Sequence, residues 1–155
     1  MAVEQTEAIV LRSYNLTDSS KIIVLLTPAR GKVRAVAKGV RRTKSKFGSS
    51  LEPITHVDAQ IYMKDNRDLQ TLSQAETRNS FAPLRSDLKR LSFASIMCEL
   101  IEQFVQENEE AQDFFFLLSG SLNLLSNMSR NYESLLVFFY LKLLDASGLL
   151  PVLSH

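Results

Sequence analysis

The sequence predicts an α+β protein in which a small barrel of five strands is followed by an α-helical domain. Short stretches of alternating or continuous apolar residues occupy positions 1–80, whereas apolar residues at helical spacing occupy positions 81–155. The charge divides at the same point, because the first part has a net charge of +5 and the second a net charge of −4, within a chain of net charge +1. We therefore expect two modules with different partners.

Five short strands are predicted in the first module. Each stretch is rich in β-branched or alternating apolar residues and is bounded by residues that favour turns. The predicted strands cover residues 6–14, 21–27, 32–40, 55–64 and 69–77. Five strands in so short a stretch indicate a small barrel. We expect the OB-fold, whose strand faces and adjoining loops commonly bind oligonucleotides.

The third predicted strand lies within a basic stretch, residues 30–46. This stretch holds eight Lys and Arg residues and neither Asp nor Glu. The alternation within the strand places the cations Lys32, Arg34 and Lys38 on one solvent-exposed face. Residues 41–50 are predicted to form a basic loop, because glycine and serine mark its end.

A cationic strand face that continues into a cationic loop suits the phosphate backbone of a nucleic acid, although a merely solubilising surface would have the same composition. Phe47 in the loop and Tyr62 on the outward face of the fourth strand could stack bases, and Phe47 could instead anchor the loop. No residue here offers obvious readout of base edges, so binding should tolerate any sequence. The residues assigned to backbone contact are Lys32, Arg34, Lys38, Arg41, Arg42, Lys44 and Lys46.

Three helices are predicted in the second module. Ser86 is the expected N-cap of the first, and the other two cover residues 111–127 and 132–146. Because residues 135–141 are apolar on all sides, we expect the third helix to be central. Pro151 is the expected stop signal beyond it.

Residue types needed for catalysis or metal binding are scarce. Cys98 is the single cysteine, and His56 and His155 are the two histidines, so neither a metal site nor a Ser-His-acid triad is expected. We predict that the protein is not an enzyme and that this stretch of chain holds no cofactor. The N-terminus lacks a basic signal region, and no uncharged run reaches the ~20 residues of a bilayer span. A cytoplasmic protein without a membrane partner is expected.

Four stretches together resemble the RecO family of bacterial recombination mediators. They are EAIVLRSYNLTDSSKIIVLLTPARGKVRAVAKGVRRTKSKF from Glu7, LEPITHVDAQIYMK from Leu51, DLQTLSQAET from Asp68 and LRSDLKRLSFASIMCELIE from Leu84. Similar proteins continue past the equivalent of Pro151, many of them into a four-cysteine zinc site. The chain is therefore expected to be a fragment with an exposed apolar helical face.

The resemblance implies a mediator of DNA repair and homologous recombination. Such a protein binds single- and double-stranded DNA, anneals complementary strands and helps to load recombinase onto DNA coated by single-strand-binding protein, at the bacterial nucleoid. Its implied partners are RecR and the acidic, apolar tail of single-strand-binding protein. Arg85 and Lys89, one turn apart on the first predicted helix, are the cations expected to contact that tail. The alternatives are a protein-interaction adaptor and an RNA-binding OB-fold module.

Overall fold

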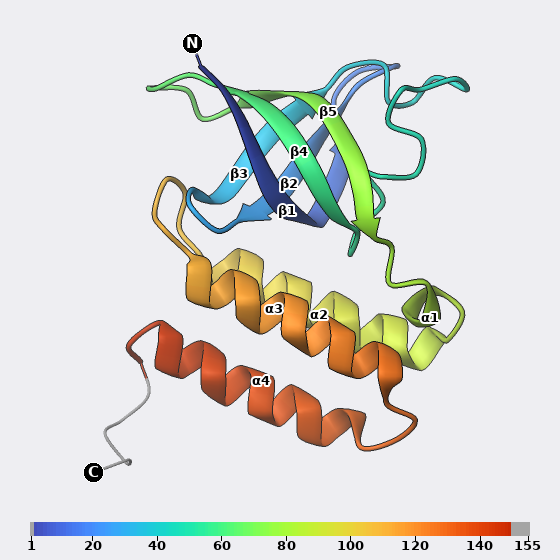
Figure 1. The fold of residues 1–155 in the computed structure, drawn as a ribbon, viewed down its shortest axis with the longest axis vertical. Helices are drawn as coiled ribbons and strands as arrows, with labels where there is room; N and C mark the ends of the chain where they lie inside the picture. The colour runs from blue at the N-terminus through green and yellow to red at the C-terminus, as the bar shows by residue number, and fades with distance from the viewer. Residues whose placement is uncertain (1, 150–155) are drawn as a thin grey trace.

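A closed barrel of five strands stands on two layers of helices (Figure 1). The computed structural model describes residues 2–149. The strands are β1 (Ala2–Asn15), β2 (Lys21–Thr27), β3 (Gly31–Ala37), β4 (His56–Met63) and β5 (Gln70–Asn79). They close in the order β1-β2-β3-β5-β4, which is the five-stranded arrangement of an OB-fold. The predicted fold class is confirmed.

β1 is long enough to pair with two neighbours. Its first half runs antiparallel to β4 and its second half antiparallel to β2. A bulge between Val10 and Arg12 lies just beyond the point where the two halves meet, and such a bulge bends a strand. β3 and β5 complete the closure by pairing in parallel over a short stretch. The barrel therefore has a continuous wall, and one set of its apolar side chains is directed inward.

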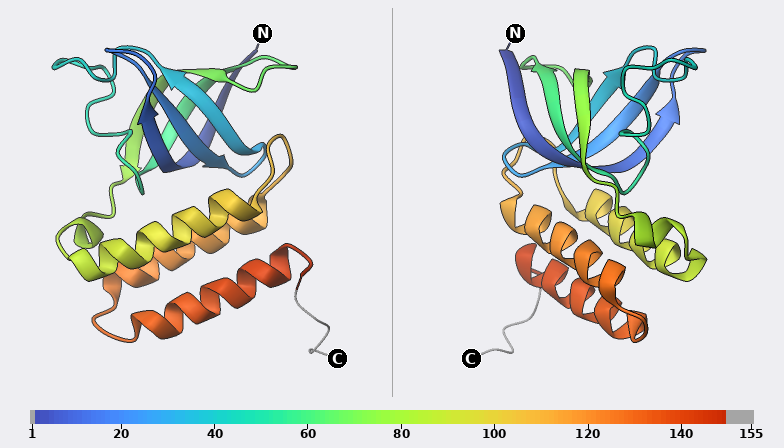
Figure 2. Two further views of the ribbon diagram at one scale, coloured as in Figure 1. Left: turned by 180° about the vertical axis from the view of Figure 1, so that it is seen from behind. Right: turned by 45° about the vertical axis from the view of Figure 1, so that its right-hand side comes forward.

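The helices are α1 (Ala82–Arg85), α2 (Leu88–Phe104), α3 (Gln112–Asn127) and α4 (Tyr132–Ala146). α2 and α3 lie side by side beneath the barrel, and α4 forms the outer layer (Figure 2). The first predicted helix corresponds to α2, and the short α1 that precedes it, separated by Ser86 and Asp87, was not predicted. Asp87, rather than Ser86, is the N-cap of α2, since its side chain accepts a hydrogen bond from the Lys89 backbone N–H at 3.0 Å.

α4 is not the central helix that its composition predicted. It buries one face against α2 and α3, whereas Val137, Phe138 and Leu141 on other faces are 60%, 48% and 48% exposed. The prediction was wrong because the described residues place neighbours on one side of α4 only. Pro151, the predicted stop signal, lies outside the described residues.

Two apolar cores hold the molecule together. One fills the barrel, and the other joins the outer surface of β1 and β2 to the helices. The joining core includes Ile9, Val24, Leu26, Ile54, Met97, Ile101, Phe115, Leu118 and Phe139. Burial of each such side chain contributes roughly 1.5–3 kcal/mol relative to exposure. The helical layer is therefore fixed to one side of the barrel wall.

The loop between α2 and α3, residues 105–111, also fastens the helices to the barrel. The Lys32 backbone N–H donates to the Gln106 carbonyl oxygen at 3.2 Å. Gly31 has a φ angle of 65°, and a Cβ atom at this position would collide with the carbonyl oxygens of Gln106 and Glu109. Only glycine can combine this backbone conformation with so close an approach.

Candidate nucleic-acid interface

β1, β2 and β3 share an outer face of which the helices cover only the lower part. Across this face Tyr14 pairs with Ile22, and Ile22 pairs with Val36. One row closer to the helices, Arg12 of β1 and Arg34 of β3 flank the same middle strand. The face thus combines a half-buried aromatic ring, the half-buried Val36 beside the buried Ile22, and two arginines.

Arg12 and Tyr14 are members of this face that sequence reasoning missed. The Arg12 guanidinium carbon lies 4.8 Å from the centroid of the Tyr14 ring. Arg12 also donates three hydrogen bonds to the Glu102 carboxylate of α2, the shortest at 2.8 Å, and these bonds raise the pKa of Arg12 above its usual value. The i, i+2 spacing of Arg12 and Tyr14 was the available signal, since it places both on one face of a strand.

The helical module also contacts the two cations of β3. The Lys32 ammonium group donates to the Glu102 carbonyl oxygen at 2.9 Å. Arg34 Nε lies 3.3 Å from Glu107 Oε1, yet it makes no hydrogen bond to any described residue. The distance is that of an ion pair, but the N–H bond does not point at the oxygen. Both cations are half-buried, so neither is a free surface charge.

The other five assigned cations lie beyond β3. β3 ends at Ala37, so Lys38 belongs to the loop and not to the strand as predicted. The chain leaves β3 at the end of the barrel farthest from the helices (Figure 1). All five side chains are exposed, and none forms an ion pair with any residue from 2 to 149. These loop cations are Lys38, Arg41, Arg42, Lys44 and Lys46.

A groove of about 380 Å³ opens between this loop and the β1–β2 turn. Lys38 and Arg42 supply its positive charge, while Leu16 and Val36 supply an aliphatic surface. Arg41 fixes the loop to the turn, because its guanidinium donates to the Thr17 carbonyl oxygen at 2.7 Å. Cations beside an aliphatic surface can hold a phosphate and the adjoining sugar or base.

The two aromatic residues proposed to stack bases do not join this groove. Phe47 is 2% exposed and packs inside the barrel, so the prediction of base stacking is wrong and the ring anchors the loop. The Lys46 ammonium group lies 5.1 Å from the centroid of that ring. Tyr62 is exposed, but it pairs with Val3 and Thr71 on the β1–β4–β5 side of the barrel.

Arg85 and Lys89 do not share a helix face. Arg85 ends α1, and its guanidinium donates to the Pro53 carbonyl oxygen at 2.8 Å and to the Thr55 hydroxyl at 2.9 Å. Lys89 lies in α2, with its ammonium group 3.7 Å from Glu133. The expected pairing of the two cations is wrong because the chain breaks between the helices. Arg85 instead fastens the helices to the barrel.

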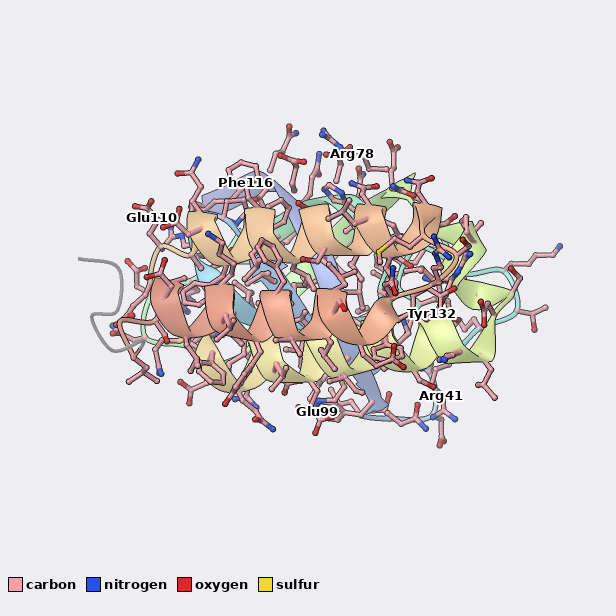
Figure 3. The ribbon with its side chains drawn as sticks, turned by 90° about the horizontal axis from the view of Figure 1, so that it is seen from below. Arg41, Arg78, Glu99, Glu110, Phe116 and Tyr132 are labelled. Carbon is pink, nitrogen blue, oxygen red and sulfur yellow. The ribbon has the colours of Figure 1, made fainter. Side chains whose placement is uncertain are left out.

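The opposite side of the barrel is acidic. Glu7, Asp58 and Glu76 line a shallow depression there, and Arg78 bridges Glu7 and Asp58 at 2.9 Å each. The hydrogen bond to Asp58 raises the pKa of Arg78. Arg41 and Arg78 lie on opposite sides of the molecule (Figure 3). A polyanion would therefore meet an attractive surface on the loop side and a repulsive one on the other.

The described residues lack a reactive thiol, a metal-binding cluster and a membrane-spanning helix. Cys98 is buried, and this burial raises the pKa of its thiol to about 12, so the nucleophilic thiolate is absent at neutral pH. Residues 2–149 contain no group of three His, Cys, Asp or Glu side chains that could hold a metal ion. Among these residues, no helix has the length and apolar character needed to cross a membrane.

The fold and its surface define a class of protein: an OB-fold barrel that carries a basic loop and is fused to a layer of helices. The family model described as recombination protein O N terminal matches residues 1–81, and the one described as recombination protein O C terminal matches residues 85–155. The chain belongs to the RecO family.

Curated relatives carry the name DNA repair protein RecO. The protein of Symbiobacterium thermophilum is 41% identical over 154 residues, which cover 99% of this chain and 60% of the relative. That of a Nocardioides species is 42% identical over 151 residues, which cover 96% of this chain and 61% of the relative. The chain thus spans about 60% of the length of these relatives.

Proposed function

We propose that this chain is the DNA-binding part of a recombination mediator. The outer face of β1–β3 and the loop beyond it hold the sugar-phosphate backbone of a DNA strand. The observation that carries this proposal is the set of five exposed loop cations, none of which has an ion-pair partner among the described residues. Cations without internal partners are available to replace the counterions of phosphates.

The same surface supports the annealing of complementary strands. Its contacts are those of charge with phosphate, and the face offers one aromatic ring, the partly buried Tyr14. A strand held by its backbone keeps its base edges free to pair with a second strand. The loop cations also reduce the repulsion between the two backbones, so single- and double-stranded DNA are both ligands of this surface.

The helical module is the surface we assign to protein partners. α4 exposes Val137, Phe138 and Leu141, and the Lys142 ammonium group lies 5.6 Å from the centroid of the Phe138 ring. An apolar surface beside a cation suits the acidic, apolar tail of single-strand-binding protein. With RecR as a second partner, the protein would load recombinase onto coated DNA at the bacterial nucleoid.

The test is a variant in which Arg41, Arg42, Lys44 and Lys46 are all changed to Ala. Binding to labelled oligothymidylate is measured over a range of salt concentrations. Each lost phosphate contact should lower the slope of log affinity against log salt by roughly 0.7, so the loss should reach roughly 2.8. An unchanged slope with a native circular dichroism spectrum would contradict the proposal.

A matched control separates local contact from total charge. Arg130→Ala with Lys142→Ala removes two exposed cations from the far end of the molecule, the same charge as Arg41→Ala with Arg42→Ala. The loop pair should lower the slope and the control pair should not. Tighter binding to RNA of equal sequence would favour an RNA-binding module, and preference for an acidic peptide would favour an adaptor.

A further inference from the structure

Each arginine on the outer face of the barrel lies against a carboxylate of the helical module, but the two pairs are built differently. Arg12 and Glu102 form a fork with hydrogen bonds of 2.8 to 3.2 Å. Arg34 and Glu107 approach to 3.3 Å, and Arg34 Nε is buried without a hydrogen bond to any described residue. Arg12 is therefore satisfied by its carboxylate, whereas Arg34 still lacks an acceptor.

The position of Glu107 is set by the backbone and not by its side chain. Glu107 forms isolated β-bridges with Gly31 and Lys32 at the start of β3. These bridges bring its carboxylate to Arg34, which follows on the same strand. The two side chains are 37% and 36% exposed, so dissolved anions reach part of the pair, whereas Arg34 Nε itself is shielded from solvent. The contact is thus partly accessible and incomplete.

We propose that Glu107 stands in for a phosphate group. In the free protein it holds Arg34 on the outer face, and in the complex it yields Arg34 to a phosphodiester of the bound strand. Glu102 keeps Arg12 in both states. This inference rests on the proposed function, because it assigns to one end of the same surface an arginine, Arg34, for which the DNA phosphate competes with Glu107.

The surroundings of the pair suit a phosphate only once Glu107 has moved aside, because the cleft itself has a volume of about 10 Å³. Arg67 and Asp68 of the β4–β5 hairpin line the same small cleft as Arg34 and Glu107, together with Lys32. Arg34 and Arg67 therefore face Glu107 and Asp68 there, whereas the Lys32 ammonium group is bound to the Glu102 carbonyl oxygen. A guanidinium whose Nε lacks an acceptor gains a charge-assisted hydrogen bond when a phosphate oxygen arrives. The carboxylates reduce that gain, and they make the helix end of the surface its weaker end.

Salt dependence distinguishes displacement from a permanent ion pair. A displaced Glu107 attracts a cation from solution, which offsets the cation that the phosphate releases. Glu107→Gln removes this offset while it keeps the size of the side chain. The variant should bind oligothymidylate roughly threefold more tightly at low salt, with a slope steeper by up to roughly 0.7.

Glu110→Gln is the matched control, since Glu110 is an exposed glutamate of the same loop and forms no ion pair with the described residues. Glu107→Ala provides a second variant at the tested position, and thermal melting shows whether each variant folds. Arg34→Ala is combined with Glu107→Gln to complete a double-mutant cycle. The proposal predicts that the gain from Glu107→Gln disappears when Arg34 is absent.

Equal gains from Glu107→Gln and Glu110→Gln would overturn the proposal, because they would reflect total charge alone. A gain that survives Arg34→Ala, or no gain at all, would overturn it as well. The quadruple loop variant tests the proposed function separately. If that variant loses binding while Glu107→Gln changes nothing, the DNA-binding surface stands and only the role of Glu107 falls.

Discussion

The two ends of the basic stretch both carry Lys and Arg without any Asp or Glu, but they have different neighbours. At the loop end, five cations extend into solvent, and the described residues provide no carboxylate for them. Toward the helices, Arg34 lies against the Glu107 carboxylate, and the Lys32 ammonium group donates to the backbone carbonyl oxygen of Glu102. A run of positive charge therefore becomes a binding surface only where the rest of the fold does not neutralise it.

The largest effect on stability should come from replacing Phe47, which anchors the loop end of the basic stretch. Phe47→Ala removes a ring that is almost completely buried in the barrel, and the cavity should lower the free energy of unfolding by about 3–5 kcal/mol. Urea denaturation measures this loss. Ser49→Ala, at an exposed position of the same loop, is the control. Similar stabilities for the two variants would mean that the loop needs no anchor.

Gly31→Ala tests the fastening at the helix end. The new Cβ atom would meet the carbonyl oxygens of the α2–α3 loop at a φ angle of 65°, so unfolding should become easier by roughly 2–3 kcal/mol. Gly48 of the basic loop has a φ angle of 55° and open space around it. Gly48→Ala should therefore cost only about 1 kcal/mol, from backbone strain alone. Equal losses in urea denaturation would show that the contact with the loop adds nothing.

Arg12→Ala should have the smallest effect on stability. Its pair with Glu102 is partly exposed, and such pairs typically contribute about 0.2–1 kcal/mol to stability. Because Glu102 neutralises Arg12, the salt slope of DNA binding should hardly change, whereas Arg41→Ala should lower it by roughly 0.7. The comparison of the two ends breaks down if both variants change the slope equally.

Periodicity and composition were sufficient to predict most elements of the fold. Residues 21–27 and 132–146 were predicted with the bounds that β2 and α4 have, because each is an apolar run bounded by residues that favour turns. β1 begins four residues before its predicted start. Residues 2–5 contain little apolar pattern and become a strand by pairing with β4, which no local signal reveals.

Predictions of position and partner were weaker than predictions of element type. An aromatic residue in a basic loop suggested base stacking, yet Phe47 reaches the apolar interior beneath the loop. Arg12 and Tyr14 were missed because only the register across three strands places them beside Arg34. The same limit applies to α4, whose composition shows that it is apolar but not which elements cover it.

The core between barrel and helices has a consequence for how this architecture can be divided. A barrel cut after Asn79 would leave Ile9, Val24 and Leu26 facing water, since the helices that pack against β1 and β2 are α2 and α3. The composition of the chain changes near residue 80, but its buried surface does not divide there. The OB-fold of this protein is therefore not a portable unit, and transplanting it into another protein would require a new apolar partner for its outer wall.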